Sequence, residues 1–181
     1  NKVLDLREQF GAPSTDPELP VDFEDLPFWS AVDRILDQAQ LSLYAYGEEK
    51  ALNLIARPQG QLPRSGRACY SGPFRLEPTR VEAIRDLRDP TGQRLALLME
   101  ISWEPRISPI SLQFPLDRIE ASDENGNPLP IDAKLAKLEV PGDSQSMATE
   151  LRLPFELPSR DVKQIARLKG TLKTLVQGRV E

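Results

Sequence analysis

The chain of 181 residues contains no histidine and a single cysteine, Cys69. Histidine is the usual general base near neutral pH, so its absence excludes Ser–His–Asp and Cys–His catalytic sites within this sequence. It also excludes zinc sites built on histidine, and one cysteine excludes four-cysteine zinc sites and paired redox thiols. We therefore predict that this sequence carries no catalytic residue, no cofactor and no metal ion, and that it is not an enzyme.

Further absences restrict the partners. The sequence has no glycine-rich phosphate-binding loop and no apolar run of about 20 residues, so we predict neither a P-loop nor a segment that spans a membrane. The net charge is −5, and nucleic-acid phosphates require a basic surface, so we expect no nucleic-acid partner. Because the sequence starts at Asn1 rather than at methionine, we expect a processed or trimmed piece of a longer protein.

Charge is unevenly distributed along the chain. The first fifty residues are rich in acid, whereas the C-terminal end is basic, with Arg160, Lys163, Arg167, Lys169, Lys173 and Arg179. One interpretation is that these are two solvated surfaces of opposite sign. The alternatives are that the two halves attract each other, or that the basic strand binds an anionic polymer.

Residues 1–62 are predicted to form a small α+β domain with an N-terminal arm. Residues 21–23 alternate like a brief strand, and a helix follows with Asp25 as its N-cap and an end near Gln40. The apolar stripe of this helix comprises Phe28, Val32, Ile35, Leu36 and Ala39, and Asp33 is placed on the opposite, polar face. Residues 41–46 and 52–56 then predict a hairpin around a turn at residues 47–50.

Residues 67–181 are predicted to form an antiparallel β-sandwich of immunoglobulin-like type. Proline, glycine and polar residues between 58 and 66 mark the boundary. Residues 95–103 alternate strictly and indicate a central strand covered on both sides at one end. Further strands are expected on either side of Pro78 and within 135–140, 149–153 and 168–176, with a tight turn at Asn125–Gly126.

Three aromatic residues are the candidates for ligand binding. Tyr44 and Tyr46 share one face of a predicted strand, where they form either a platform for carbohydrate or a half-buried cross-strand contact. Trp103 ends an inward-facing series, which favours a core position over a ligand contact. Cys69 begins a β-run, and we predict a buried thiol.

Two acidic groups are weighed as alternatives. Glu100 and Glu104 flank Trp103 and would be the carboxylates of a hydrolase if they faced one cleft, but we expect them to diverge. Residues 123–127 resemble a calcium loop, yet the glycine comes too early for an EF-hand, and a solvated hairpin tip is the main interpretation.

Residues 21–43, VDFEDLPFWSAVDRILDQAQLSL, resemble the short N-terminal module of secretins and TonB-dependent receptors. With residues 72–76 (GPFRL), 101–106 (ISWEPR) and 168–170 (LKG), the whole chain is also similar to uncharacterised envelope proteins of planctomycete-type bacteria, in which this module precedes an immunoglobulin-like domain. The resemblance implies export to the periplasm or cell envelope and a binding or structural role, and supplies no catalytic residues. A secretin would continue into further modules and a membrane barrel, which this sequence lacks.

These observations leave three hypotheses for function. The main one is a non-catalytic interaction or scaffold module, which binds another envelope protein through free sheet edges. The second is a carbohydrate-binding module that uses Tyr44, Tyr46 or Trp103. The third is a hydrolase based on Glu100 and Glu104. The oligomeric state stays open.

Overall fold

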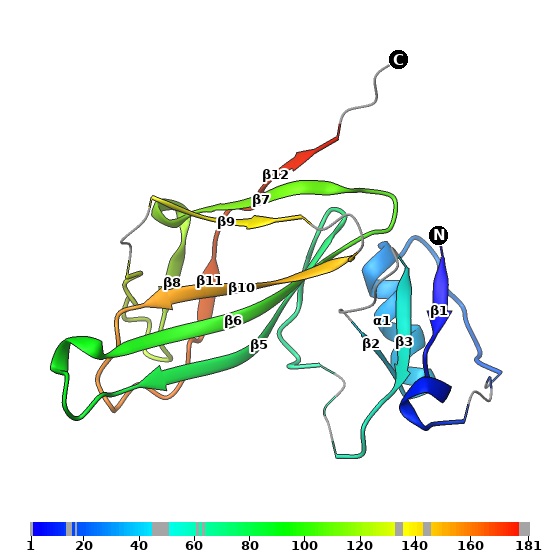
Figure 1. Ribbon diagram of the computed structural model, residues 1–181, viewed down its shortest axis with the longest axis horizontal. Coiled ribbons are helices and arrows are strands. Elements are labelled where there is room, and N and C mark those ends of the chain that lie inside the picture. Colours follow the sequence, from blue (N-terminus) through cyan, green and yellow to red (C-terminus); the bar gives the residue numbers. More distant parts are fainter. Residues whose placement is uncertain are drawn as a thin grey trace. The chain divides into compact units, whose positions relative to one another are not determined.

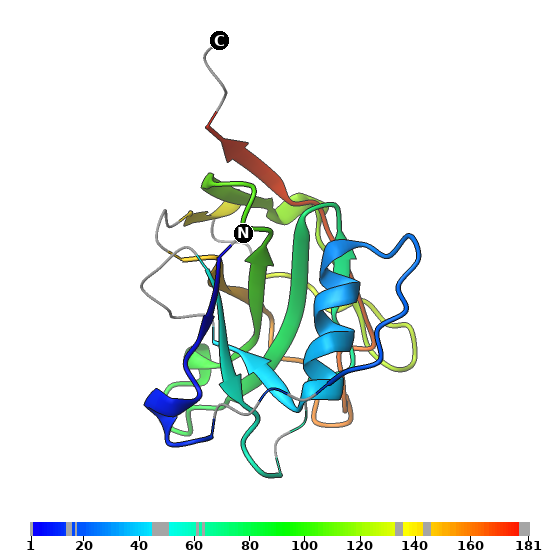
Figure 2. The same ribbon diagram turned by 90° about the vertical axis from the view of Figure 1, so that its right-hand side faces the viewer.

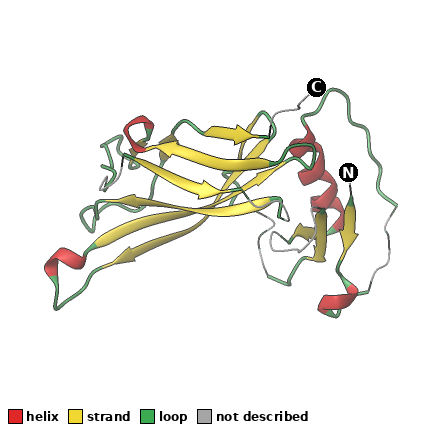
Figure 3. Cartoon of the chain, turned by 45° about the horizontal axis from the view of Figure 1, so that its top comes forward, coloured by secondary structure: helices red, strands yellow, loops and turns green. Residues whose placement is uncertain are grey.

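Strands dominate the computed structural model, which describes residues 2–13, 16, 18–44, 51–60, 62, 64–132, 136–142 and 146–177 (Figure 1, Figure 3). The elements in chain order are β1 (Val3–Asp5), η1 (Glu8–Phe10), α1 (Phe28–Ala39), β2 (Leu41–Leu43), β3 (Leu52–Ala56), β4 (Cys69–Ser71), β5 (Phe74–Ile84), η2 (Pro90–Gly92), β6 (Arg94–Trp103), β7 (Pro109–Pro115), η3 (Leu116–Arg118), β8 (Glu120–Ser122), β9 (Lys137–Pro141), β10 (Ala148–Phe155), β11 (Arg167–Lys169) and β12 (Lys173–Val176). The described chain is therefore mixed α and β and mostly β, as expected.

The chain divides into two compact units. The first unit comprises Asn1–Glu77, Glu100–Ser108 and Asp143–Thr149, and the second comprises Pro78–Met99, Pro109–Gly142 and Glu150–Glu181. Strands β5, β6 and β10 each contain residues of both units. The expectation of two separately folding domains, 1–62 and 67–181, stays a prediction.

The helix α1 ends as predicted but begins later. Gln40 adopts a left-handed conformation with φ of 56°, and its backbone N–H donates to Asp37, which closes the last turn. At the other end the N-cap is Pro27, with no side-chain capping bond, so Asp25 is not the N-cap. Ala31 donates the first helical hydrogen bond to the Pro27 carbonyl, and proline is tolerated there because its missing N–H would have no partner.

The buried face of α1 is rotated from the predicted stripe. The buried residues are Trp29, Asp33 and Leu36, whereas Ile35 is 38% exposed. The placement of Asp33 on the polar face was therefore wrong. Asp33 is buried because basic side chains from elsewhere in the first unit compensate its charge, as described below.

A three-stranded sheet with the order β1-β3-β2 belongs to the first unit (Figure 2). The predicted hairpin is confirmed, because β2 pairs antiparallel with β3 in the register Leu41↔Ala56 to Leu43↔Leu54. The first strand of this sheet is β1, parallel to β3, and not residues 21–23, which form no strand. Helix α1 contacts β2, so one helix packs on this sheet.

A small core joins helix and sheet in the first unit. Trp29, Leu52 and Met147 are buried together, with Phe28, Val32 and Leu43 packed against them. The Trp29 indole N–H donates to the Pro73 carbonyl at 3.0 Å, which satisfies the polar end of this buried aromatic residue.

The predicted central strand is confirmed as β6, which lies between β10 and β5 in a sheet of order β10-β6-β5-β4. Both faces of β6 are buried over most of its length. By contrast, β5 runs through Pro78 without the expected interruption. In the described ladder, strand β4 pairs with residues 74–76 of β5, so Pro78 lies beyond the residues that this ladder joins.

The second unit contains the ladders β12-β7-β9 and β11-β8. The predicted strand 168–176 is two strands, because β11 pairs with β8 and β12 pairs with β7. The turn at Asn125–Gly126 is confirmed, with φ of 84° at Gly126. The Asp123 carboxylate accepts the backbone N–H groups of Asn125 and Asn127 at 2.8 Å, so it organises the loop itself.

Candidate functional site: a buried ionic cluster

A network of charged side chains surrounds Asp33 inside the first unit. Its Oδ2 atom accepts a hydrogen bond from the Tyr70 hydroxyl at 2.6 Å and another from the Arg75 Nε at 3.1 Å. The side chains of Asp33 and Arg75 are each 5% exposed. Helix α1 therefore presents a carboxylate to side chains of β4 and β5, and this ion pair is shielded from water.

Arg75 contacts two further carboxylates. Its guanidinium group pairs with Glu77, its neighbour on the same face of β5, and its Nη1 lies 3.5 Å from the Glu100 Oε1 on β6. The other oxygen of the Glu77 carboxylate accepts the backbone N–H of Ser65 at 2.7 Å. Ser102 donates its hydroxyl to the Glu100 Oε1 at 3.3 Å. The Arg75 guanidinium group thus contacts three carboxylates.

A second layer of the cluster lies along α1. Arg64 pairs with Asp37 and lies 3.6 Å from the Asp33 Oδ1. Arg57 pairs with Asp37 at 3.0 Å and also donates to the carbonyls of Leu36 and Leu41. The cluster therefore joins the C-terminal part of the helix to the chain that follows β3.

The charges of this cluster do not cancel. Its four carboxylates are Asp33, Asp37, Glu77 and Glu100, and its three guanidinium groups are Arg57, Arg64 and Arg75. Four negative charges against three positive charges leave one net negative charge when all are ionised. Because unpaired buried charge is costly, this residual charge must lie where it is partly solvated.

Of the three carboxylates that Arg75 contacts, Glu100 has the longest ion pair and the largest exposed fraction. Burial raises the pKa of Glu100, and Arg75 only partly opposes this effect because Glu77 and Asp33 add repulsion. Burial, together with the hydrogen bond to Asp33, also raises the pKa of Tyr70 to about 12, so its hydroxyl stays a donor. Glu100 is 28% exposed, which makes it the carboxylate of the Arg75 group that is most accessible to water.

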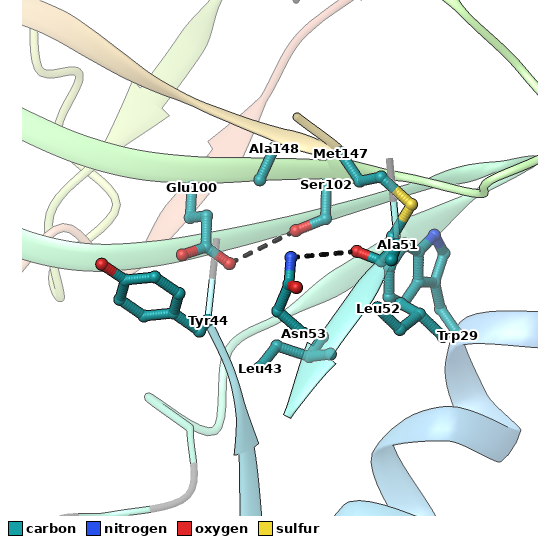
Figure 4. A pocket seen from close by; sticks show the side chains of 10 residues that line it. All are labelled: Trp29, Leu43, Tyr44, Ala51, Leu52, Asn53, Glu100, Ser102, Met147 and Ala148. Atoms are coloured by element: carbon teal, nitrogen blue, oxygen red, sulfur yellow. Dashed lines mark hydrogen bonds between the residues drawn. The ribbon is translucent and has the colours of Figure 1, made fainter. Parts of the chain in front are cut away.

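Glu100 faces a small pocket within the first unit (Figure 4). Figure 4 shows the Glu100 carboxylate beside the Ser102 hydroxyl and the ring of Tyr44, with Met147 and Trp29 on the other side. The remaining lining residues are Leu43, Ala51, Leu52, Asn53 and Ala148. The cavity volume is about 20 Å³, which is room for about one water molecule and too small for a sugar ring.

The two aromatic candidates that the structure describes, Tyr44 and Trp103, do not form a surface platform together. Tyr44 follows the end of β2, lines the pocket and packs against Phe10, with ring centroids 5.3 Å apart. Tyr46 lies outside the described residues. Trp103 is fully buried, which agrees with a core position and leaves no exposed indole face.

The acidic pair and the cysteine are also placed by the structure. Glu104 pairs with Arg106, whereas Glu100 faces Arg75, so the two carboxylates have different arginine partners.

The expectation of a buried thiol was wrong, because Cys69 is exposed on β4. Strand β4 is the outer strand of its sheet and all three of its residues are exposed, so a β-run did not imply burial here.

Sequence reasoning missed the ionic cluster itself. Asp33 and Arg75 are 42 residues apart, and no local pattern relates them. The one available signal was the alternation of Arg75 and Glu77 on one face of a β-run, because like-facing opposite charges two residues apart can pair.

The described residues form a mostly β protein that contains a buried ionic cluster in its first unit. No family model, no curated protein and no solved structure matched this chain. Within the described residues, no group of three or more acidic or cysteine side chains is placed to hold a metal ion. The described part of the chain also contains no helix long and apolar enough to cross a bilayer.

Proposed function

We propose that this protein is a non-catalytic interaction or scaffold module of the bacterial cell envelope, which acts outside the cytoplasm and binds another envelope protein. The observation that supports this proposal is a free sheet edge with exposed apolar residues. Strand β12 is the outer strand of the β12-β7-β9 sheet, and all four of its residues are exposed. Unpaired backbone groups on such an edge can accept an added strand.

The composition of β12 fits a binding edge. Leu175 is 57% exposed and Val176 is 44% exposed, although protected edge strands usually carry charge or proline at such positions. Lys173 and Thr174 complete the strand, so it combines two apolar residues with one cation. A partner strand with alternating apolar and acidic residues would complement both the backbone and the side chains.

Compartment and domain type belong to the same proposal. The resemblance of residues 21–43 to the short N-terminal module of secretins and TonB-dependent receptors supports export. One helix on the β1-β3-β2 sheet is compatible with that module. The antiparallel ladders β7–β9 and β12–β7 are compatible with an immunoglobulin-like second domain.

A charge change on β12 tests the strand-addition proposal. The double substitution Leu175→Lys and Val176→Lys is expected to abolish the capture of a partner from envelope extract, since lysine opposes edge pairing. Both residues are exposed, so folding is expected to be unchanged. The control is Leu87→Lys, at a residue that is 93% exposed outside any strand. A partner that both variants retain, or no partner at all for a strictly monomeric protein, would contradict the proposal.

The alternative is a carbohydrate-binding module. The observation that favours it is the aromatic pair of Phe10, which is 57% exposed, and Tyr44. If this pair binds sugar, a glycan array should yield a ligand whose affinity falls by about two- to tenfold in Phe10→Ala, because an aromatic stacking contact contributes about 0.5–1.5 kcal/mol. If no neutral or acidic glycan on the array bound the protein, the carbohydrate-binding alternative would be excluded.

A further inference from the structure

Among the described residues, the ionic cluster in the first unit contains one carboxylate more than it contains guanidinium groups. Arg75 is shared by Asp33, Glu77 and Glu100, and the longest of its three ion pairs is the one to Glu100, at 3.5 Å. Both the Arg75 and the Ser102 hydrogen bonds reach the Oε1 atom of Glu100. Among the described residues, no hydrogen bond or ion pair reaches its Oε2 atom. Within the described cluster, the Oε2 atom of Glu100 is therefore the position at which this carboxylate lacks a partner.

That position opens into the pocket of Figure 4. Glu100, Ser102 and Asn53 provide oxygen atoms at the pocket, and the Asn53 Nδ2 is already used as a donor to the Ala51 carbonyl at 3.2 Å. An alkylammonium group has three N–H donors and no acceptor, so it can use these oxygen atoms together. The cavity volume of about 20 Å³ is of the size of such a head group.

The rest of the lining is suited to carbon rather than to a hydrated ion. Trp29, Leu52 and Met147 are the buried core residues that form one wall, and the Tyr44 ring forms another. Aromatic faces attract organic cations, and the cavity of about 20 Å³ has room for the ammonium head group itself. Calcium or magnesium would instead require about six oxygen ligands, whereas this pocket contains a single carboxylate.

We propose that the Glu100 pocket binds a primary alkylammonium group, either of a small amine or of a lysine side chain, which pairs with the Glu100 carboxylate. Glu100 is the anionic anchor, Ser102 and Asn53 accept further hydrogen bonds, and Tyr44 covers the bound head group. The site lies in the first unit and does not depend on strand addition to β12 in the second.

The test is a titration of the whole 181-residue chain with n-butylammonium at pH 7 and low salt, followed by NMR. The signals to follow are the Trp29 indole N–H and the Glu100 carboxyl carbon. We expect saturable shifts with n-butylammonium and none with n-butanol, which has the same carbon chain and no charge. Glu100→Gln should weaken binding about tenfold or more, because a charge-assisted hydrogen bond is lost.

The matched control is Glu82→Gln in the second unit, since the Glu82 side chain is 27% exposed and also pairs with arginine. It should bind n-butylammonium like the native chain. Equal shifts with n-butanol, or unchanged binding in a folded Glu100→Gln variant, would overturn the proposal. It would also be overturned if the Glu100 carboxyl were protonated at pH 7 and its signal did not shift when n-butylammonium is added. The last result would mean that a proton, and not a ligand, neutralises the cluster.

Two further ligands distinguish the sources of the ammonium group. The N-terminally acetylated peptide Ala-Ala-Lys-Ala-Ala, whose lysine carries its only ammonium group, is compared with the same peptide acetylated also at the lysine Nζ. Tighter binding than n-butylammonium, lost on acetylation, supports the site and assigns it to a protein lysine. Weaker but charge-dependent binding supports the site and assigns it to a small amine. Binding that survives acetylation contradicts it.

Discussion

Replacing Asp33 by alanine is expected to lower the free energy of unfolding by about 3–5 kcal/mol. The substitution removes the closest carboxylate from the Arg75 Nε and leaves the Tyr70 hydroxyl without its acceptor. Because the Arg75 side chain is 5% exposed, water cannot replace the lost partner at little cost. Urea denaturation of the native and Asp33→Ala chains measures the difference.

The control for this experiment is Asp117→Ala. Asp117 is 73% exposed and lies 3.6 Å from the exposed Arg118, so its loss should change the free energy of unfolding by less than about 1 kcal/mol. Tyr70→Phe removes only the neutral donor and should cost about 1 kcal/mol. If Asp33→Ala were no more destabilising than Asp117→Ala, the buried cluster would not contribute to stability as described.

Local patterns were sufficient for several elements of the fold. The end of α1 at Gln40, the β2–β3 hairpin and the long strand β6 each follow from a period that changes over a few residues. In each case the residues that determine the element lie close together in the sequence. They form a helical turn, a ladder of two neighbouring strands, or an alternating pattern along one strand.

Long-range pairing explains the elements that were wrong. Residues 21–23 alternate like a strand, yet the strand that pairs with β3 on this side is β1. Asp33 was assigned to the polar face because it falls outside the apolar stripe that the helical period predicts. Its burial depends on Arg75 and Arg64, which lie 42 and 31 residues further along the chain. The spacing of apolar residues along a helix gives no information about such distant charge partners.

The candidate site was unpredictable for the same reason. Glu100 was considered only as a partner of Glu104, four residues away, whereas its contacts are Arg75 and Ser102. Tyr44 was identified as an aromatic residue of interest, and the structure places it at the Glu100 pocket. Tyr44 could be selected from the sequence, but the polar groups that surround it could be identified only once the fold was known.

Replacing Arg75 by methionine is expected to be at least as destabilising as Asp33→Ala, by about 3–5 kcal/mol at pH 7. Methionine fills much of the space of the arginine stem but carries no charge, so Asp33, Glu77 and Glu100 lose the cation that they share. The control is Arg152→Met, at a side chain that is 45% exposed and pairs with Glu82 in the second unit. Its effect should be below about 1 kcal/mol.

The pH dependence of the Arg75→Met defect distinguishes lost charge pairing from lost packing. In the native chain burial raises the pKa of Glu100 and Arg75 opposes this, so the variant should raise that pKa further. A carboxyl whose folded pKa lies above its unfolded value favours the folded state below the unfolded pKa, and this contribution is lost as pH rises through the folded pKa. The difference in unfolding free energy between native and variant chains should therefore be smaller at pH 5 than at pH 7. Urea titrations at both values measure it, and a difference that does not change with pH would assign the defect to packing.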